Sequence, residues 1–420
     1  MGRALRHRDF AIYAGFALFS NLGVWVQRPA IMWLTWDLTH SGTWLGAMAM
    51  GDIIPYLLAA PFAGALTDRF DRLLVAKAAQ LAATAVTGAL TLLAFSGHLT
   101  VELLLLFVIL SGAVETFWTS VRLAMPPSLV PREDVAAALS VGAVNFNISM
   151  SVGPMIFGLI ITNWDVAWAF AFNAVSFLAY FFALQVIRLR LNEQRAAAGR
   201  NLFAEIREGI SYAFRHPGIQ LMIPLMFFGA ICLRGYRELL AGIADTVYGQ
   251  GAHGLAILLT AAGIGAIMAS LYLGNFAKVT GLTRYVNANQ LLGAVAMIVF
   301  GVTHQFWIGI LCTFVWGYAG TTIGIGSQIL LQTAVRGEVR GRVMSLWSLV
   351  IRVGPALGAL TAGGLSEWFG FQPPLLGLAI LLLIPCAILF RRRDHIASYM
   401  EVGPDEAPNA QPKADPRPAE

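Results

Sequence analysis

The stretch Gly64-Ala-Leu-Thr-Asp-Arg-Phe-Asp-Arg72 is a short charged segment between two long apolar runs. It carries Asp68, Arg69, Asp71 and Arg72, whereas the run on either side is long enough to cross a membrane. Because the short cytoplasmic loops of membrane proteins hold an excess of Arg and Lys, the segment predicts a cytoplasmic turn between two spans. Two interpretations stay open: a segment with a specific role in the protein, or an ordinary positive-inside turn with a helix-breaking glycine and no further role.

The composition is typical of a membrane protein. The 420 residues are 57% hydrophobic and 12% charged, and the mean hydropathy is +0.68. One water-soluble core cannot cover so much apolar surface. We read the net charge of +5 as a sign of membrane topology and expect no nucleic-acid partner. The three cysteines lie within apolar runs, so we expect neither a disulfide framework nor a metal site.

Apolar runs of spanning length follow one another along the chain. They predict spans at 11–36, 43–63, 73–96, 101–121, 135–163, 166–187, 218–247, 253–275, 285–303, 306–331, 345–367 and 372–390. Alternate loops contain no Lys or Arg, and 24 of the 28 basic residues fall in the N-terminal segment, the other loops with their helix ends, the central linker and the tail. This asymmetry predicts a multi-pass membrane protein with both termini cytoplasmic. We expect the membrane to be a bacterial inner membrane.

Four regions are expected along the chain. Residues 1–187 and 218–392 each hold six spans and form two bundles. The linker 188–217 has apolar residues at every fourth position from Leu202 to Phe214, which predicts an amphipathic helix on the inner membrane surface. The tail 393–420 has too little apolar content to pack, so it is predicted to be disordered.

The two halves repeat each other at a spacing near two hundred residues. The matching segments are Val130–Ser140 with Val335–Ser345, and Gly153-Pro154 and Gly158 with Gly354-Pro355 and Gly358. A parallel repeat of six helices is typical of facilitator transporters, which bind substrate near the midplane between the halves.

The stretch from Gly64 to Arg72 resembles the loop between helices 2 and 3 of the major facilitator superfamily. Gly64, Leu66, Asp68, Arg69 and Arg72 match its pattern, and Asp71 stands where most members have Gly. Further stretches resemble the branch that holds the enterobactin exporter and the macrolide efflux proteins. They are Phe19–Gln27, Arg122–Pro131, Thr260–Ala266 and Gln332–Ser345.

The resemblance implies twelve transmembrane helices in two pseudo-symmetric bundles, with helices 1 and 7 lining the substrate cavity. It also implies a gate in which the loop packs on the inner end of helix 11. Its members are Gly64, Asp68, Arg69 and Arg72 of the loop, Arg342 near helix 11, and the bending pairs Gly153-Pro154 and Gly354-Pro355. Helix 5 only partly matches the antiporter pattern, because Ser140, Ser149 and Phe157 replace Gly. The matching Gly153-Pro154 and Gly158 favour export, whereas the departures leave uptake open.

Charged residues inside the spans are candidates for function, because they are costly in lipid unless they face a cavity or a partner. Counted at about 1.5 Å per residue, four of them fall near the midplane: Arg28, Asp52, Arg237 and Glu238. Arg234 belongs to this set through its place beside Arg237 and Glu238 on the seventh span. We expect all five to form a proton-coupling and substrate cavity with Asn21 and Gln27. The alternative is that Arg28–Asp52 and Arg234–Glu238 are only neutralising pairs. Glu115 and Arg352, nearer the inner ends, are expected to act in gating.

The sequence contains no phosphate-binding Gly-rich loop, His-Glu-x-x-His or Cys-x-x-Cys motif, so we expect neither an enzyme nor a cofactor. The favoured function is a proton-coupled exporter of an amphiphilic compound of the drug or siderophore class. Alternatives are an uptake symporter for a small metabolite and a non-transporting sensor or assembly protein. The expected partners are a small molecule, protons and membrane lipid, and the protein is expected to be a monomer.

Overall fold

The computed structural model describes residues 2–189, 218–276, 278–335 and 337–403. These ranges contain helices and no strand, which suits a hydrocarbon environment, because a helix satisfies its backbone hydrogen bonds internally. Eleven helices in this part of the chain are long and apolar enough to cross a membrane, and α2 makes a twelfth by its length. The prediction of an all-α membrane protein with twelve spans is confirmed.

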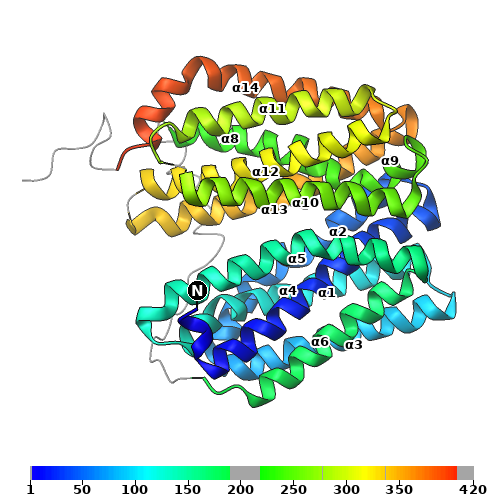
Figure 1. Ribbon diagram of the computed structural model, residues 1–420, viewed down its shortest axis with the longest axis vertical. Coiled ribbons are helices and arrows are strands. Elements are labelled where there is room, and N and C mark those ends of the chain that lie inside the picture. Colours follow the sequence, from blue (N-terminus) through cyan, green and yellow to red (C-terminus); the bar gives the residue numbers. More distant parts are fainter. Residues whose placement is uncertain (1, 190–217, 277, 336, 404–420) are drawn as a thin grey trace, which may run out of the picture.

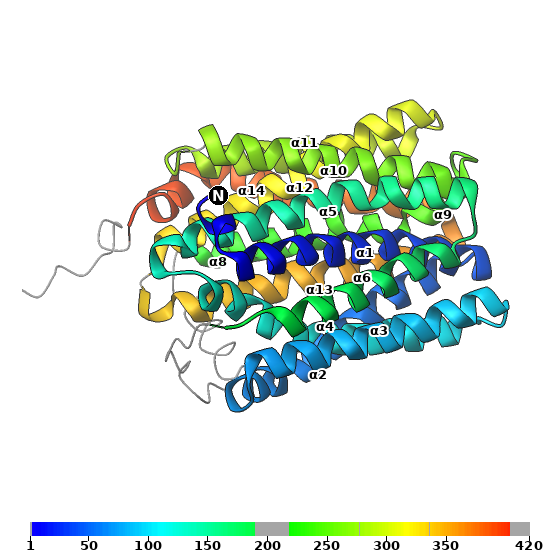
Figure 2. The same cartoon turned by 60° about the horizontal axis from the view of Figure 1, so that its bottom comes forward.

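The helices form two bundles, which lie one above the other in Figure 1; in Figure 2 the lower, N-terminal bundle is turned forward. The N-terminal bundle consists of α1 (Arg8–Thr39), α2 (Gly42–Arg69), α3 (Arg72–Ser96), α4 (Val101–Leu129), α5 (Val135–Asn163) and α6 (Ala167–Val186). In the C-terminal bundle the seventh span comprises α8 (Ile219–Gly229), η3 (Ala230–Arg234), η4 (Tyr236–Leu239) and α9 (Leu240–Thr246). It is followed by α10 (Gly251–Phe276), α11 (Leu282–Val302), α12 (Phe306–Ala334), α13 (Gly337–Phe369) and α14 (Gln372–Met400).

Two helix pairs join the bundles: α2 packs on α13, and α5 packs on α10. These are spans 2 with 11 and 5 with 8, so a shift by six spans exchanges one pair with the other. The internal repeat of the sequence therefore appears as a pseudo-twofold relation between the bundles. We call the end that carries the N-terminus and the α2–α3 turn the basic end, and the opposite one the far end.

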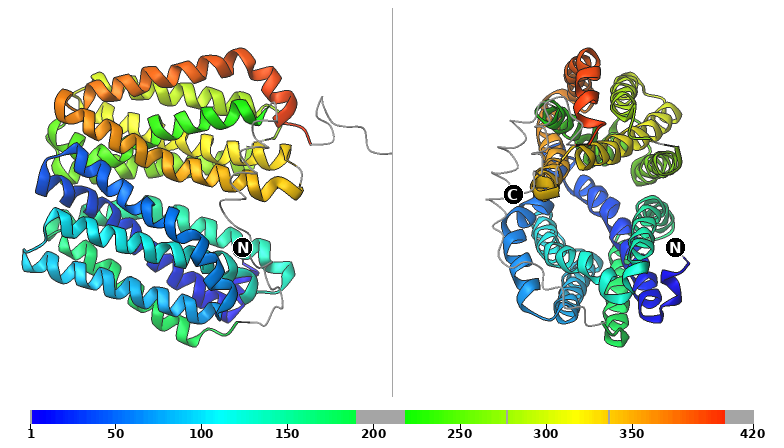
Figure 3. Two further views of the ribbon diagram at one scale, coloured as in Figure 1. Left: turned by 180° about the vertical axis from the view of Figure 1, so that it is seen from behind. Right: turned by 90° about the vertical axis from the view of Figure 1, so that its left-hand side faces the viewer.

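The bundles come closest at the far end. Gly42 of α2 lies against the backbone of Gly363 of α13, and a Cβ on either residue would collide with the other helix. Small residues allow two helices to approach in this way. From that contact α2 runs away from the C-terminal bundle toward the basic end, as Figure 3 shows from behind.

Several helices are longer than the apolar runs that predicted them. The fourth span ends at Leu129 instead of residue 121, the eleventh begins at Gly337 instead of 345, and the twelfth ends at Met400 instead of 390. Apolar content marks the part in lipid, whereas a helix continues into water as long as its backbone and packing favour it.

The predicted start of the tail at residue 393 is wrong, because residues 393–400 belong to α14. Ile396 and Met400 are buried, and Glu401 accepts hydrogen bonds from the backbone N–H groups of Gly281 and Thr283, at 2.6 and 2.8 Å. The carboxylate therefore caps the start of α11. The amphipathic helix expected within 188–217 and the tail after residue 403 lie outside the described residues.

The seventh span, predicted as one helix, is broken in its middle. A π-helical segment, η3, is followed by the 3-10 helix η4. A 3-10 helix advances about 120° per residue against about 100° in an α-helix. Residues four apart therefore no longer face the same way, and residues three apart do. This break decides how Arg234, Arg237 and Glu238 are presented.

Candidate functional site

A small hollow lies where the two bundles meet, and side chains from both enclose it. Its lining consists of Trp25, Arg28, Pro29 and Met32 of α1, Pro154 of α5, Arg237 and Glu238 of η4, and Leu259 of α10. The structure thus brings together Arg28 of the first span with Arg237 and Glu238 of the seventh, as the sequence predicted.

Trp25 is the centre of this arrangement. The guanidinium carbons of Arg28 and Arg237 each lie 5.3 Å from the centroid of its ring system, within the range of a cation–π interaction. Phe146 of α5 meets the indole edge-on at 5.7 Å between centroids. The indole is therefore held between a residue of its own helix, a residue of α5 and a residue of the other bundle.

Gly153 explains how α5 reaches Trp25. A Cβ at this position would lie 2.5 Å from the Cβ of Trp25 and 2.8 Å from its carbonyl oxygen, so a larger residue would push α1 away. Gly354 has the same role in the second half, since a Cβ there would lie 2.5 Å from the Cβ of Ala230 in η3. Each glycine precedes a proline, Pro154 or Pro355, and each pair lets a bending helix pack on the cavity helix of its own bundle.

Arg28 and Asp52 form an ion pair of 3.3 Å between α1 and α2. Their side chains are 50% and 42% exposed, so the pair faces accessible space and is not sealed inside the bundle. The neutralising pair suggested by the sequence exists, yet Arg28 remains part of the hollow. The charges of Glu238 and Glu115 also act on Arg28.

Glu115 lies nearer to this centre than the sequence suggested. Because α4 continues to Leu129, Glu115 sits at the middle of the helix and not near its end. Gly112, one turn before it, packs directly on the carbonyl oxygen of Asp52. The Glu115 carboxylate is exposed, accepts a 3.1 Å hydrogen bond from Thr119 Oγ1, and interacts electrostatically with Arg122, Arg28 and Asp52.

The pairing of Arg234 with Glu238 is not found. Both residues are described, and no ion pair or hydrogen bond joins them. The reason is the break in the seventh span, because the 3-10 turn removes the four-residue alignment of an α-helix. Arg237 lies three residues after Arg234, and the positive charge of Arg234 acts unfavourably on it.

The remaining predicted cavity residues lie on α1. Gln27 is buried and accepts a 2.6 Å hydrogen bond from Asn173 of α6 through its Oε1 atom. It therefore fixes α1 to α6 and is not among the residues that line the hollow. Asn21 is half-buried and does not line the hollow.

The predicted gating residues lie between the middle of the bundles and the basic end. The Arg352 guanidinium of α13 lies 4.3 Å from the ring centroid of Tyr56 in α2, which connects the bundles. Arg72 Nη1 donates a 3.4 Å hydrogen bond to Ser128 Oγ at the end of α4, and Arg342 is half-buried in the first turns of α13. Gly64, Asp68 and Arg69 belong to the last turns of α2, and their side chains lie outside the described part of the chain.

The far end contains bundle contacts that the sequence did not reveal. Trp36 Nε1 donates to Asp245 Oδ2 at 2.9 Å. The Glu367 carboxylate accepts from Ser41 Oγ at 2.5 Å and from the backbone N–H of Thr43 at 3.0 Å. Each contact joins residues more than two hundred positions apart, so no local pattern could have indicated them.

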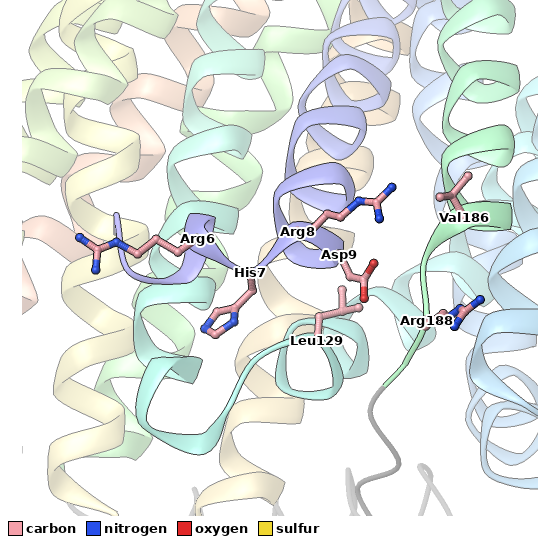
Figure 4. A pocket seen from close by; sticks show the side chains of 7 residues that line it. All are labelled: Arg6, His7, Arg8, Asp9, Leu129, Val186 and Arg188. Atoms are coloured by element: carbon pink, nitrogen blue, oxygen red, sulfur yellow. The ribbon is translucent and has the colours of Figure 1, made fainter.

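A second hollow, of about 670 Å³, lies at the basic end and not between the bundles. It is lined by Arg6, His7, Arg8, Asp9, Leu129, Val186 and Arg188. Figure 4 shows Arg6 pointing away from Arg8 and Arg188. His7 Nε2 lies 2.8 Å from Asp134 Oδ2, which fixes the start of α1 to the α4–α5 loop. None of the residues predicted for the cavity or the gate lines this hollow.

The two bundles, their pseudo-twofold relation and the charged hollow at their junction define a membrane transporter of the major facilitator fold, not an enzyme. The model of the transmembrane secretion effector family matches residues 3–411, and the chain belongs to this family.

Two relatives and one solved structure illustrate the relationship. Macrolide efflux protein A of Streptococcus pyogenes is 24% identical over 398 residues, which cover 92% of this chain and 97% of that protein. The enterobactin exporter of Escherichia coli is 24% identical over 381 residues and covers 87% of each chain. The crystal structure of a bacterial homologue of the lysosomal transporter Spinster has a TM-score of 0.69 at 15% identity, covering 92% of this chain and 97% of that one. The predicted superfamily and branch are confirmed.

If the Glu367 contacts hold the two bundles together at the far end, a variant without this carboxylate should show the bundles farther apart there. Glu367→Ala removes the acceptor of two hydrogen bonds, from Ser41 and from Thr43. Each contributes about 1 kcal/mol, so the population with separated far ends should rise about thirtyfold. Spin labels on His98 and His304, one in each bundle, should report it as a longer distance in pulsed EPR. Glu102→Ala is the control, because Glu102 is a carboxylate in the first turn of α4 that makes no contact with the other bundle. An unchanged distance distribution in Glu367→Ala would show that this contact does not hold the ends together.

Proposed function

We propose that this protein is a proton-coupled exporter of an amphiphilic organic compound of the drug or siderophore class. The observation that carries the proposal is the hollow at the bundle junction, where Arg28 and Trp25 of α1 meet Arg237 and Glu238 of η4. A substrate bound there contacts both bundles, so it responds to their relative movement. Relatives named as efflux and export proteins cover almost the whole chain, which supports export.

Alternating access is the proposed mechanism. In this conformation the bundles are joined at the far end through Trp36–Asp245 and Glu367 with Ser41 and Thr43, and Tyr56–Arg352 is a further link between α2 and α13. We propose that export requires these contacts to break while the basic ends of α2 and α13 approach. Asp68 and Arg342 are proposed as parts of the gate that then forms.

The sidedness is proposed from charge. The loops at the far end contain no Lys or Arg, whereas the basic end holds the N-terminus and the Arg-containing loops. We therefore propose that the basic end is cytoplasmic and that the protein works as a monomer in the inner membrane. Phe157 in place of Gly in the fifth span keeps an uptake symporter as the second candidate.

Transport direction separates these candidates. Cells that make the protein should accumulate less of at least one compound from a panel of dyes, macrolides and iron chelators than cells without it, and a protonophore should remove the difference. Higher accumulation would identify an uptake symporter. No difference for any compound would favour the non-transporting alternative.

Sidedness has its own test. Single cysteines that replace His98 or His304, in exposed loops of the far end, should react with an impermeant thiol reagent added to intact cells. A cysteine that replaces Arg132, exposed at the basic end, should react only after the cells are permeabilised. Labelling of residue 132 in intact cells would contradict a cytoplasmic basic end.

Asp52 and Glu238 are the proposed proton carriers. The protonation of a carboxylate depends on whether a guanidinium group lies beside it, and bundle movement would change the distances of Asp52 to Arg28 and of Glu238 to Arg28. Glu238→Gln and Asp52→Asn should each abolish uphill export in proteoliposomes and leave exchange of substrate down its own gradient intact. Glu133→Gln, at an exposed carboxylate of the basic end, is the control. Uphill export by both variants would place the coupling elsewhere, and Glu115→Gln would be tested next.

A further inference from the structure

The hollow at the bundle junction carries more positive than negative charge. Arg28 and Arg237 line it together with a single carboxylate, that of Glu238, and the only ion pair that the described residues form with these two arginines joins Arg28 to Asp52 at 3.3 Å. Glu238 acts on Arg237 electrostatically but lies beyond ion-pair distance. We infer that the transported compound is an organic anion, whose carboxylate or similar planar anionic group binds between Arg28 and Arg237. The inference rests on the proposed transport function and specifies its substrate class.

The geometry provides two guanidinium groups for one anion. Arg28 and Arg237 come from different bundles, and both lie 5.3 Å from the centroid of the same indole, that of Trp25. The backbone of α5 at Gly153 packs on Trp25, and the Phe146 ring meets the indole edge-on. The planar fork of an arginine suits a carboxylate, which accepts two parallel hydrogen bonds from it. An anion placed there would bridge the bundles.

The charges around Arg237 disfavour a cationic substrate. Both Arg28 and Arg234 repel it, and Glu238 is the one carboxylate that acts on it in return. Uncompensated charge is costly in a membrane interior, so an anion lowers the free energy of the site and a cation raises it. The positive charge that attracts an anion therefore also disfavours the binding of a cationic drug.

The charges on the other side do not reverse this balance. On the N-terminal bundle, Glu115 interacts with Arg122 as well as with Arg28, and Asp52 is paired with Arg28. These two carboxylates thus face two guanidinium groups of their own bundle. The C-terminal bundle provides Arg234 and Arg237 against Glu238 alone, which is the source of the positive excess.

The remaining lining residues indicate the chemistry of the rest of the compound, which we call its body. Pro29 and Met32 of α1, Pro154 of α5 and Leu259 of α10 offer apolar surface beside the charged groups, and the Trp25 indole offers an aromatic face. A compound with an apolar or aromatic body and one anionic head matches both surfaces in its chemistry. The hollow measures only about 20 Å³ in this conformation, so binding of such a compound requires the bundles to move apart there. Carboxylate-bearing aromatic compounds are the simplest members of this class.

The test compares two dyes with the same xanthene ring and opposite charge, 5-carboxyfluorescein as the anion and rhodamine 6G as the cation. The purified full-length protein is placed in proteoliposomes with an imposed proton gradient, and export of each dye is measured. We expect 5-carboxyfluorescein to move at least about tenfold faster. Arg237→Gln should raise the KM for 5-carboxyfluorescein about tenfold, which is the effect of losing one charge-assisted interaction. Arg237→Lys should recover part of the affinity, and Arg132→Gln, at the basic end, should behave as the unchanged protein.

The outcomes distinguish a failure of the anion inference from a failure of the proposed transport function. Equal or faster transport of rhodamine 6G overturns the anion inference and leaves the exporter in place, as does an Arg237→Gln variant with unchanged KM. If neither dye moves, the compounds exported in the cell panel are sorted by charge. Export of anionic members supports the inference, and export of only neutral or cationic members overturns it. A panel with no exported compound removes the proposed function, and the inference with it.

Discussion

The contact of two guanidinium groups with one indole, at the level where the bundles meet, is the interaction on which the rest of the site depends. Trp25 receives Arg28 from its own helix and Arg237 from the opposite bundle. It holds this position because Gly153 lets the backbone of α5 lie directly on it. Charge inside a membrane protein is tolerated where it meets partners or water, and this junction supplies partners in Asp52 and Trp25. The bundles are thus linked through a charged centre whose energy changes when they move apart.

The break in the seventh span determines the balance of charges at this centre. A continuous α-helix would have turned Arg234 toward Glu238 and balanced the two charges. The π segment and the 3-10 turn remove this alignment and leave Arg234 and Arg237 without an equal number of carboxylates. Irregular helical turns at membrane depth are acceptable where they line a cavity or are covered by protein. Gly235 and Gly358 lie in contact beside this break, so α13 covers it closely.

Sequence reasoning identified most of the site, and its errors have structural causes. It placed Arg28 opposite Arg237 and Glu238 because depth along a helix can be counted when the ends of a span are known. It misplaced Glu115, since the apolar run underestimated the length of α4, and it did not indicate the partner of Gln27, since an isolated amide does not reveal which face of α1 it occupies. The hydrogen bond between Gln27 and Asn173 joins helices 1 and 6, which no local pattern specifies.

The sequence by itself determined that this chain crosses the membrane about twelve times, that its halves are related, and which end carries the positive charge. These properties follow from composition and short motifs, because the cost of exposing polar groups to lipid acts on each segment separately. Only the tertiary structure decided which charges meet. The Arg237–Trp25 contact, the Glu115–Asp52 neighbourhood and the Glu367 contact with Ser41 and Thr43 join residues far apart along the chain. Their energies depend on distances of a few ångströms, which helix packing sets and linear sequence does not.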